Sequence, residues 1–412
     1  MPDDACVYLS TITRPATSRR GLTLVGGNVL ALGTVSLITD VSSEMVTAIL
    51  PMYLVLGLHV SPLAYGVVDG VYTGATAVLR LAGGYLADRF RGRKAVAGFG
   101  YALSAVAKLG LLAAGRSMTA FGVVIAADRL GKGLRTAPRD ALITLSVPQE
   151  ALGRAFGVHR MMDSIGAFLG PLVALAVLAA SAESYDAVFV TSFCIAVLGV
   201  LVLVLFVREQ RTVTVAPPAA LREALALLRD PPVRRLAGAA CLLGLATVGD
   251  GFVFLLLQRR EDLGIAWFPL LAVGTSLAYL LLATPLGVLA DRVGRLPVVL
   301  GGYVALAGTY LLLFGPVGGW PLLVLALGLY GLFYAATDGI LVALAGPLLP
   351  ERLRTTGIAL VQTGQALAYL VSSVLFGLAW QTFGPETASR LAAAVVVLAI
   401  GATLVVLRRR TP

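Results

Sequence analysis

Long apolar runs separated by short polar connections make up most of the chain. A helix that crosses the hydrocarbon core of a bilayer needs about 20 predominantly apolar residues. The sequence contains twelve runs of this kind, so it predicts an all-α integral membrane protein with twelve transmembrane helices. The predicted helices lie at residues 28–57, 62–87, 95–115, 118–145, 154–180, 186–207, 236–258, 266–290, 297–315, 320–347, 356–380 and 388–408.

The basic residues outside these runs predict the orientation of the chain. Twenty-one Lys and Arg residues lie on the side of the two chain ends, and four lie on the opposite side: Arg116, Arg259, Arg260 and Arg390. Cytoplasmic loops of membrane proteins carry an excess of Lys and Arg. We therefore expect both termini to be cytoplasmic.

The longest connection, residues 208–235, divides the runs into two sets of six. It contains two Pro-Pro pairs that bracket a short amphipathic stretch, which is typical of a helix lying at the membrane surface; a regulatory docking site is the alternative. The segments expected are a cytoplasmic tail at 1–27, a six-helix bundle at 28–207, this cytoplasmic linker, a second six-helix bundle at 236–408 and a tail at 409–412.

Composition supports a membrane environment and excludes several other classes. The chain is 58% hydrophobic and 13% charged, whereas soluble domains are about a quarter charged. The net charge of +10 does not indicate nucleic-acid binding, because Lys and Arg lie between the apolar runs and not on a soluble surface. The lipid bilayer is therefore the expected surrounding.

The sequence predicts no cofactor site, no metal site and no secretion signal. The three cysteines form no disulfide framework and no CxxC pair, and no G-x4-GK-[ST] loop for ATP is present. The polar N-terminal segment lacks the apolar core of a signal peptide. The 29 Arg against 3 Lys indicate a GC-rich, bacterial genome, so we expect the protein in a bacterial inner membrane. We also expect it to be a monomer.

One short motif occurs twice. Residues 83–94 read GGYLADRFRGRK and residues 284–295 read TPLGVLADRVGR, and the first copy has one extra residue between its Asp and the following Gly. An internal duplication is common in secondary transporters. We expect these two loops to form a conformational latch, with the candidate residues Gly84, Asp88, Arg89, Arg93, Gly287, Asp291, Arg292 and Arg295.

Twelve spans, a central loop and the duplicated motif together resemble the major facilitator superfamily (MFS) over nearly the whole chain. That resemblance implies two pseudo-symmetric bundles, transport by alternating access and no enzymatic activity. Arg129 followed by Gly133 resembles the family's R-x-x-x-G element, in which the Arg is tied to proton coupling. Farther on, a second pattern resembles the antiporter motif of drug-efflux members: Gly157, Gly166, Gly170 and Pro171.

Two acids in the first run form a candidate proton site. Asp40 and Glu44 are four residues apart, so they stack on one helix face. Two carboxylates so close in a low dielectric cannot comfortably both ionise, and one is expected to carry a proton, with Arg129 as the electrostatic partner of the pair. The alternative is a static ion pair between one acid and an Arg of the fourth run.

The fourth run carries a basic stripe, Arg129, Lys132, Arg135 and Arg139. The stripe can hold the acids of the first run, Asp40 or Glu44, ionised until cargo or a proton displaces the pairing, or it can attract an anionic headgroup of the cargo. Alternatively, Arg135 and Arg139 extend to the cytoplasmic interface, as long basic side chains often do. In the fifth run, His159 and Asp163 lie one turn apart. They are a candidate proton relay, with a simple hydrogen-bonded histidine as the alternative; a metal site is not expected.

The second half offers candidates for the lining of a substrate cavity. Each of its two intramembrane acids is followed by glycine, and either could meet a cationic group of the cargo. Together with Lys132 and Arg135, the candidate cavity residues are Asp250, Asp338, Tyr334, Gln362 and Gln365.

These observations favour a secondary transporter that exports a small amphiphilic or drug-like molecule in exchange for protons, as in multidrug resistance. An organic-anion or lipid-headgroup transporter that uses the basic stripe is the first alternative. An intramembrane enzyme is a further alternative, but the sequence shows no nucleophile–base or metal constellation for it.

Overall fold

The computed structural model describes residues 26–90, 92–115, 117–148, 151–209, 226–338, 344, 348–349 and 354–408. Side chains are described at all of these positions except 77, 78, 80–90, 118, 153, 354–356 and 408. Within these limits the chain is all-helical, without strands, as the apolar runs predict.

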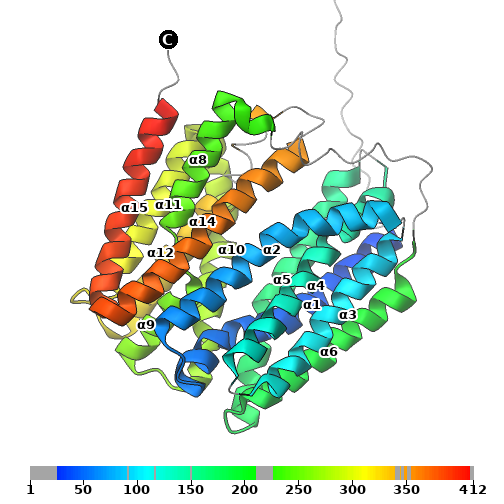
Figure 1. Cartoon of the computed structure of the whole chain (residues 1–412), viewed down its shortest axis with the longest axis horizontal. Helices are drawn as coiled ribbons and strands as arrows, with labels where there is room; N and C mark the ends of the chain where they lie inside the picture. Colours follow the sequence, from blue (N-terminus) through cyan, green and yellow to red (C-terminus); the bar gives the residue numbers. More distant parts are fainter. Residues whose placement is uncertain are drawn as a thin grey trace, which may run out of the picture.

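Each predicted run corresponds to one helix or, in one case, to a pair of helices (Figure 1). The first six are α1 (Gly27–Met52, continued by a π-helical turn, Tyr53–Gly57), α2 (Pro62–Phe90), α3 (Arg93–Ala114), α4 (Met118–Leu145), α5 (Leu152–Ala180) and α6 (Tyr185–Phe206). The later ones are α8 (Pro231–Leu245), α9 (Asp250–Glu261), α10 (Pro269–Val293), α11 (Arg295–Leu312), α12 (Gly319–Thr337), α14 (Arg354–Phe383) and α15 (Pro385–Arg408).

Among the described residues, ten segments are long and apolar enough to cross a membrane. The helices α2 and α4 are not among the ten. In α4 the reason is plain, because six ionisable residues lower its hydropathy: Asp128, Arg129, Lys132, Arg135, Arg139 and Asp140. Both helices pack against other helices, α4 against α2 and α3, and α2 also against α14. The charged α4 is thereby shielded by its neighbours, and the protein is a multi-pass membrane protein.

The seventh predicted run, 236–258, is broken. Its helix begins earlier, at Pro231, inside the segment predicted as linker, and is interrupted between Leu245 and Asp250. The backbone N–H of Val248 in this break donates to the Tyr310 hydroxyl at 2.8 Å, and the Tyr330 hydroxyl, whose single hydrogen is shared with the Asp250 carboxylate, lies 3.2 Å from the Val248 carbonyl oxygen. Two tyrosines thus replace the missing helical hydrogen bonds.

The tenth predicted run, 320–347, is shorter as a helix. The helix α12 ends at Thr337, where Asp338 adopts an extended backbone conformation. Most of the remaining predicted run, and residues 219–225 of the amphipathic stretch of the predicted linker, lie outside the described residues; the end of that stretch forms a 3₁₀ turn, Leu227–Arg229.

Helices pack mainly with others of the same half of the sequence. In the first half α1 contacts α5 and α6, and α3 contacts α4 and α6; in the second half α10 and α11 contact α12, and α8 contacts α14 and α15. Between the halves, α2 packs along α14, with smaller contacts of α5 with α10 and of α1 with α9 (Figure 1).

Candidate functional site

The two acids of α1 lie where α5 approaches most closely. A Cβ atom on Gly166 would lie 2.5 Å from the Leu37 carbonyl oxygen, and one on Gly170 would lie 2.6 Å from the Glu44 Cβ atom. Both glycines are therefore required by space. Pro171 is buried beside them, whereas Gly157 of the same motif faces open space. Only two of the three motif glycines bring α5 against the α1 acids.

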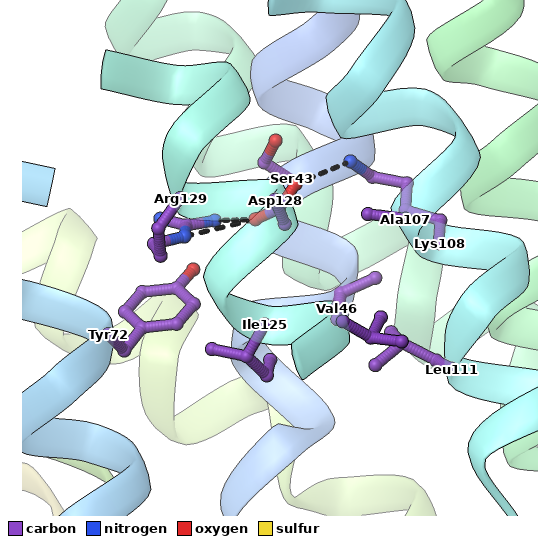
Figure 2. Close-up of a pocket in the computed structure, with 10 residues that line it drawn as sticks. Ser43, Val46, Tyr72, Ala107, Lys108, Leu111, Ile125, Asp128 and Arg129 are labelled. Atoms are coloured by element: carbon purple, nitrogen blue, oxygen red, sulfur yellow. Dashed lines mark hydrogen bonds and ion pairs between the residues drawn. The ribbon is translucent and has the colours of Figure 1, made fainter. Parts of the chain in front are cut away.

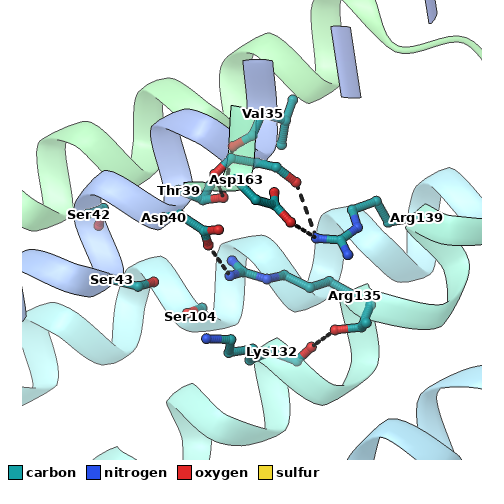
Figure 3. Close-up of polar contacts among 12 residues, drawn as sticks. Val35, Thr39, Asp40, Ser42, Ser43, Ser104, Lys132, Arg135, Arg139 and Asp163 are labelled. Atoms are coloured by element: carbon teal, nitrogen blue, oxygen red, sulfur yellow. Dashed lines mark hydrogen bonds and ion pairs between the residues drawn. The ribbon is translucent and has the colours of Figure 1, made fainter. Parts of the chain in front are cut away.

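The basic stripe of α4 is largely neutralised by acids. The Arg135 Nη2 atom lies 3.7 Å from the Asp40 Oδ1 atom (Figure 3), and its guanidinium stacks over the Tyr101 ring at 4.5 Å. Arg139 reaches Asp163 at 4.0 Å and Asp140 at 3.0 Å. Because these cations are paired inside the protein, Arg135 and Arg139 do not simply snorkel to the interface.

Arg129 has a different partner from the one expected. Its Nε atom donates to the adjacent Asp128 at 3.0 Å, and its guanidinium lies 3.6 Å from the centre of the Tyr72 ring. Asp128 also accepts a hydrogen bond from Ser104 and lies 3.6 Å from the Lys108 Nζ atom (Figure 2). Arg129 thus belongs to a buried cluster with Asp128 and Lys108, and no ion pair joins it to the α1 acids.

A small cavity adjoins this buried cluster. It is lined by Ser43, Tyr72, Lys108, Asp128 and Arg129 together with apolar side chains, and its volume is about 20 Å³ (Figure 2). This is room for on the order of one water molecule.

Glu44 and Lys132 differ from the other charged groups of this region. Neither makes a hydrogen bond or an ion pair within 4.0 Å with the side chains that the structure describes. Lys132 is nevertheless the charged group that acts most strongly on Glu44. The α1–α4–α5 network therefore contains one acid and one base without a fixed partner.

His159 and Asp163 face each other on α5. The His159 Nδ1 atom lies 3.5 Å from Asp163 Oδ1, but neither ring nitrogen forms a hydrogen bond. The His159 side chain is almost fully buried. Contact between the two candidate relay residues is present, but the hydrogen bond that would carry a proton between them is not formed here.

The candidates of the second half are not all brought together. Asp250, the first residue of α9, accepts hydrogen bonds from Tyr330 at 2.9 Å and from Tyr334. Asp338 lies exposed at the end of α12, where the Tyr279 hydroxyl donates to it at 3.1 Å. Gln362 and Gln365 of α14 are both partly buried.

The structure describes only part of the duplicated motif. For Gly84, Asp88 and Arg89 the structure describes only the helical backbone, while Arg93 is buried at the start of α3. In the second copy, Asp291 and Arg292 are exposed at the end of α10, Gly287 faces open space, and Arg295 begins α11. The latch remains a prediction.

Sequence reasoning assigned no role to Asp69. This residue of α2 accepts hydrogen bonds at one oxygen, Oδ2, from Tyr369 at 2.9 Å and from Ser373 at 2.6 Å, both on α14. An acid inside an apolar run is the signal that could have found it, but its partners lie some 300 residues away in sequence.

The chain matches the sequence profile of the Major Facilitator Superfamily over residues 32–274 and 260–412. It belongs to this superfamily. It is 31% identical over 372 residues to an uncharacterised MFS-type transporter of Methanocaldococcus jannaschii, covering 87% of this chain and 89% of that protein. The resemblance inferred from the motifs is thereby confirmed.

Solved MFS structures share the fold. A mutant of the nucleoside transporter NupG superposes with a TM-score of 0.79 at 16% identity, covering 92% of this chain and 99% of that one. A POT family transporter in complex with 5-aminolevulinic acid gives a TM-score of 0.78 at 14% identity, covering 94% and 97%. At identities this low, the similarity shows a shared fold but does not indicate which cargo is transported.

Membership of the MFS defines the general activity. The protein is a membrane transporter of small molecules and not an enzyme. Among the described residues, no group of three or more His, Cys, Asp or Glu side chains is placed to hold a metal ion. The charged network of α1, α4 and α5 is the candidate site for coupling transport to an ion gradient.

Proposed function

We propose that this MFS member is a proton-coupled exporter of small amphiphilic, drug-like molecules that works by alternating access in a bacterial inner membrane. In this proposal the halves at residues 28–207 and 236–408 rock against each other in a monomer whose two ends are cytoplasmic. The single observation that carries the proposal is Glu44, an acid inside the charged network that forms no ion pair with any described side chain.

The reason is that a coupling acid must be able to change its charge at little cost. Protonating Asp128 would leave two buried cations, Lys108 and Arg129, without their partner, which is strongly unfavourable. Glu44 has no such pair to lose among the side chains that the structure describes. Glu44 is thus suited to bind and release a proton, with Asp40 and its longer contact to Arg135 as the second member of the pair.

The position of Glu44 also links its charge to movement. Gly170 of α5 packs directly on Glu44, and Gly166 packs on the turn that carries Asp40. A shift of α5 against α1 therefore changes the surroundings of both acids. Coupling then arises because a proton and the cargo have different affinities for the two arrangements.

A cationic or neutral amphiphile fits better than an anion. Arg129, Arg135 and Arg139 each have an acid within 4.0 Å, so an anionic cargo would have to compete with these pairs. Asp250 with its two tyrosines offers an acidic and aromatic surface, which suits an ammonium group. Lys132, which lacks an ion pair, is the one observation that favours the organic-anion alternative.

The test uses purified protein in proteoliposomes. Uptake of a cationic dye and of an organic anion is measured with and without an imposed pH gradient. For one proton exchanged per cargo molecule, the dye should accumulate up to about tenfold per pH unit, and collapse of the gradient should abolish accumulation. Glu44→Gln should remove the gradient-driven accumulation but leave downhill exchange of the dye.

The matched control is Glu183→Gln, which changes an exposed acid in the connection between α5 and α6 and should behave as the unmodified protein. If dye accumulation persisted after collapse of the gradient and in the double variant Asp40→Asn plus Glu44→Gln, proton exchange through this pair would be excluded. Gradient-driven accumulation of the anion alone would instead identify the organic-anion alternative.

A further inference from the structure

The two halves of the sequence meet closely at the first turns of α2. A Cβ atom on Gly66 would collide with the Ser373 carbonyl oxygen of α14, and one on Gly74 would lie 2.9 Å from the Leu370 Cδ1 atom. The start of α9 packs similarly, because a Cβ atom on Gly251 would lie 2.6 Å from the Pro51 Cγ atom of α1. With the chain ends in the cytoplasm, these contacts close the outer end of the molecule. We call them the outer junction.

Two acids, one from each half, lie in the outer junction, where the Asp69 carboxylate packs against Gly249, the residue that precedes Asp250. Asp69 of α2 is held by the hydroxyls of Tyr369 and Ser373, and Asp250 of α9 by those of Tyr330 and Tyr334. Asp250 is the charged group that acts on Asp69. For both acids, the hydroxyl donors converge on one carboxylate oxygen, Oδ2 of Asp69 and Oδ1 of Asp250, so each has a second oxygen on which a proton can reside.

The described side chains place no cation in the outer junction. No described Lys, Arg or His lies within 4.0 Å of either acid. Besides each other, the titratable groups that act on the two acids or are bonded to them are one further acid, Glu44 of α1, which acts on Asp250, and five tyrosines: Tyr65 of α2, Tyr310 of α11, Tyr330 and Tyr334 of α12, and Tyr369 of α14. The network around α4 differs, because there the acids of α4 and Asp40 have a cationic partner.

This absence has a physical consequence for closure. Two ionised carboxylates side by side repel each other, and each loses hydration when helices close around it. Hydroxyl donors offset only part of that loss, and no positive charge is present to balance the rest. A proton shared by the two acids removes the repulsion and turns one carboxylic acid into a further hydrogen-bond donor.

We propose that the outer junction is a proton-operated gate, in which the pair Asp69 and Asp250 must hold one proton for the outer end to close. The proton comes from the outer aqueous phase while the gate is open, and closure carries it inside the protein. This proposal rests on the proposed function only in taking the bound proton as the one that drives transport. It identifies the pair Asp69 and Asp250 as the group that first binds a proton from the outside.

Gly249, between α8 and α9, is a second part of this gate. A Cβ atom there would collide with the Asp69 carboxylate and lie 2.5 Å from the Tyr369 hydroxyl. Its backbone has φ −63°, which any residue adopts, so glycine is required there by space alone. A methyl group at this position should keep the gate from closing at any pH.

The experiment reads gate opening by thiol accessibility, without cargo. Cys6, Cys194 and Cys241 are replaced by Ser, and Leu370→Cys serves as reporter because Leu370 packs on Gly70 and Gly74. A membrane-impermeant maleimide is added to the outside of intact cells. Labelling at Glu386→Cys, an exposed position at the start of α15, corrects for the pH dependence of the reaction between thiol and maleimide. The corrected rate should be about tenfold higher at about pH 8 than at about pH 5.5, since the open gate is the deprotonated one.

Two variants should shift the reporter in opposite directions. Asp69→Asn, which keeps the acceptor oxygen and removes the charge, should give slow labelling at both pH values. Gly249→Ala should give fast labelling at both. A misfolded protein cannot produce both results, so the pair of variants guards against a trivial loss of structure.

The proposal is overturned by reporter labelling that does not depend on pH, by an Asp69→Asn variant that keeps the full pH dependence, or by slow labelling of Gly249→Ala at low pH. Because no cargo is present, these outcomes are independent of the transport assay on Glu44. Either proposal can therefore fail while the other stands.

Discussion

Buried charges of this transporter differ in how firmly they are held. Asp128 is contacted by Lys108, Arg129 and Ser104 at once, whereas Glu44 has no ion pair. A residue with several charged partners is a structural element that fixes α3 to α4. A residue with none is free to change its charge, which is why the two acids are expected to respond differently to substitution.

Removing the charge of Asp128 should destabilise the fold. Asp128→Asn leaves Lys108 and Arg129 buried without a counter-charge, and their side chains are 5% and 4% exposed. Loss of one partner of a buried ion pair costs about 3–5 kcal/mol, so thermal unfolding in detergent should occur at a clearly lower temperature.

The matched control for this substitution lies about three turns along the same helix. Asp140→Asn removes an acid that is 42% exposed and paired with Arg139, so its cost should stay below about 1 kcal/mol. Equal melting temperatures for the two variants would show that Asp128 is not the structural centre assigned to it.

The partners of single residues could not be predicted from the sequence. Spacing placed Arg129 at the same depth as the α1 acids, but the pairing depends on how each helix is rotated about its axis. Neighbours in sequence do not normally face each other on a helix, yet Arg129 folds back onto Asp128 and onto the Tyr72 ring of α2. The links of Asp69 to α14 were hidden for the same reason.

At the scale of elements, the spacing of small residues in α5 was more informative. Gly166 and Gly170, two glycines of the antiporter-like pattern, let α5 approach α1, and Gly157 does not. The break between α8 and α9 was missed because hydropathy averages over a run and does not respond to a change of backbone direction. The dipeptide Gly249–Asp250 is a helix-start signal inside that run.

Substitutions by alanine should separate the three glycines of α5. Gly166→Ala and Gly170→Ala introduce a methyl group against α1 and should cost about 1–3 kcal/mol through overpacking. Gly157→Ala faces open space and should gain up to about 1 kcal/mol from helix propensity.

Thermal unfolding of the three variants in one detergent measures this difference. Transport should fall in the first two, because the same contact surrounds Asp40 and Glu44. If Gly157→Ala were as damaging as Gly170→Ala, close packing would not be the function of the motif.

The fold of the whole molecule was largely predictable, because hydropathy reports the solvent around each helix and the duplicated motif indicates the family. The arrangement of the halves was not, since a transporter adopts more than one arrangement with the same sequence. The contact of α2 with α14 describes one of them.

Locking this contact should stop transport. In a cysteine-free chain, Gly74→Cys with Leu370→Cys places two Cβ atoms 3.5 Å apart, a distance that a disulfide can bridge. Oxidation should abolish transport and a reductant should restore it, as measured by dye uptake into vesicles.

Each single cysteine is the control and should be insensitive to the oxidant. Undiminished transport by the cross-linked protein would mean that α2 and α14 do not separate during the cycle at this level.

The two tyrosine hydroxyls that hold Val248 have a mechanical consequence. A continuous helix moves as one rod, because its hydrogen-bond ladder must break cooperatively before it can bend. At Val248 two side-chain hydrogen bonds take the place of that ladder, each worth about 1 kcal/mol. One proton crossing a potential of 100 mV delivers about 2.3 kcal/mol, so the hydrogen bonds that hold this break are comparable in energy to the passage of a single coupling ion.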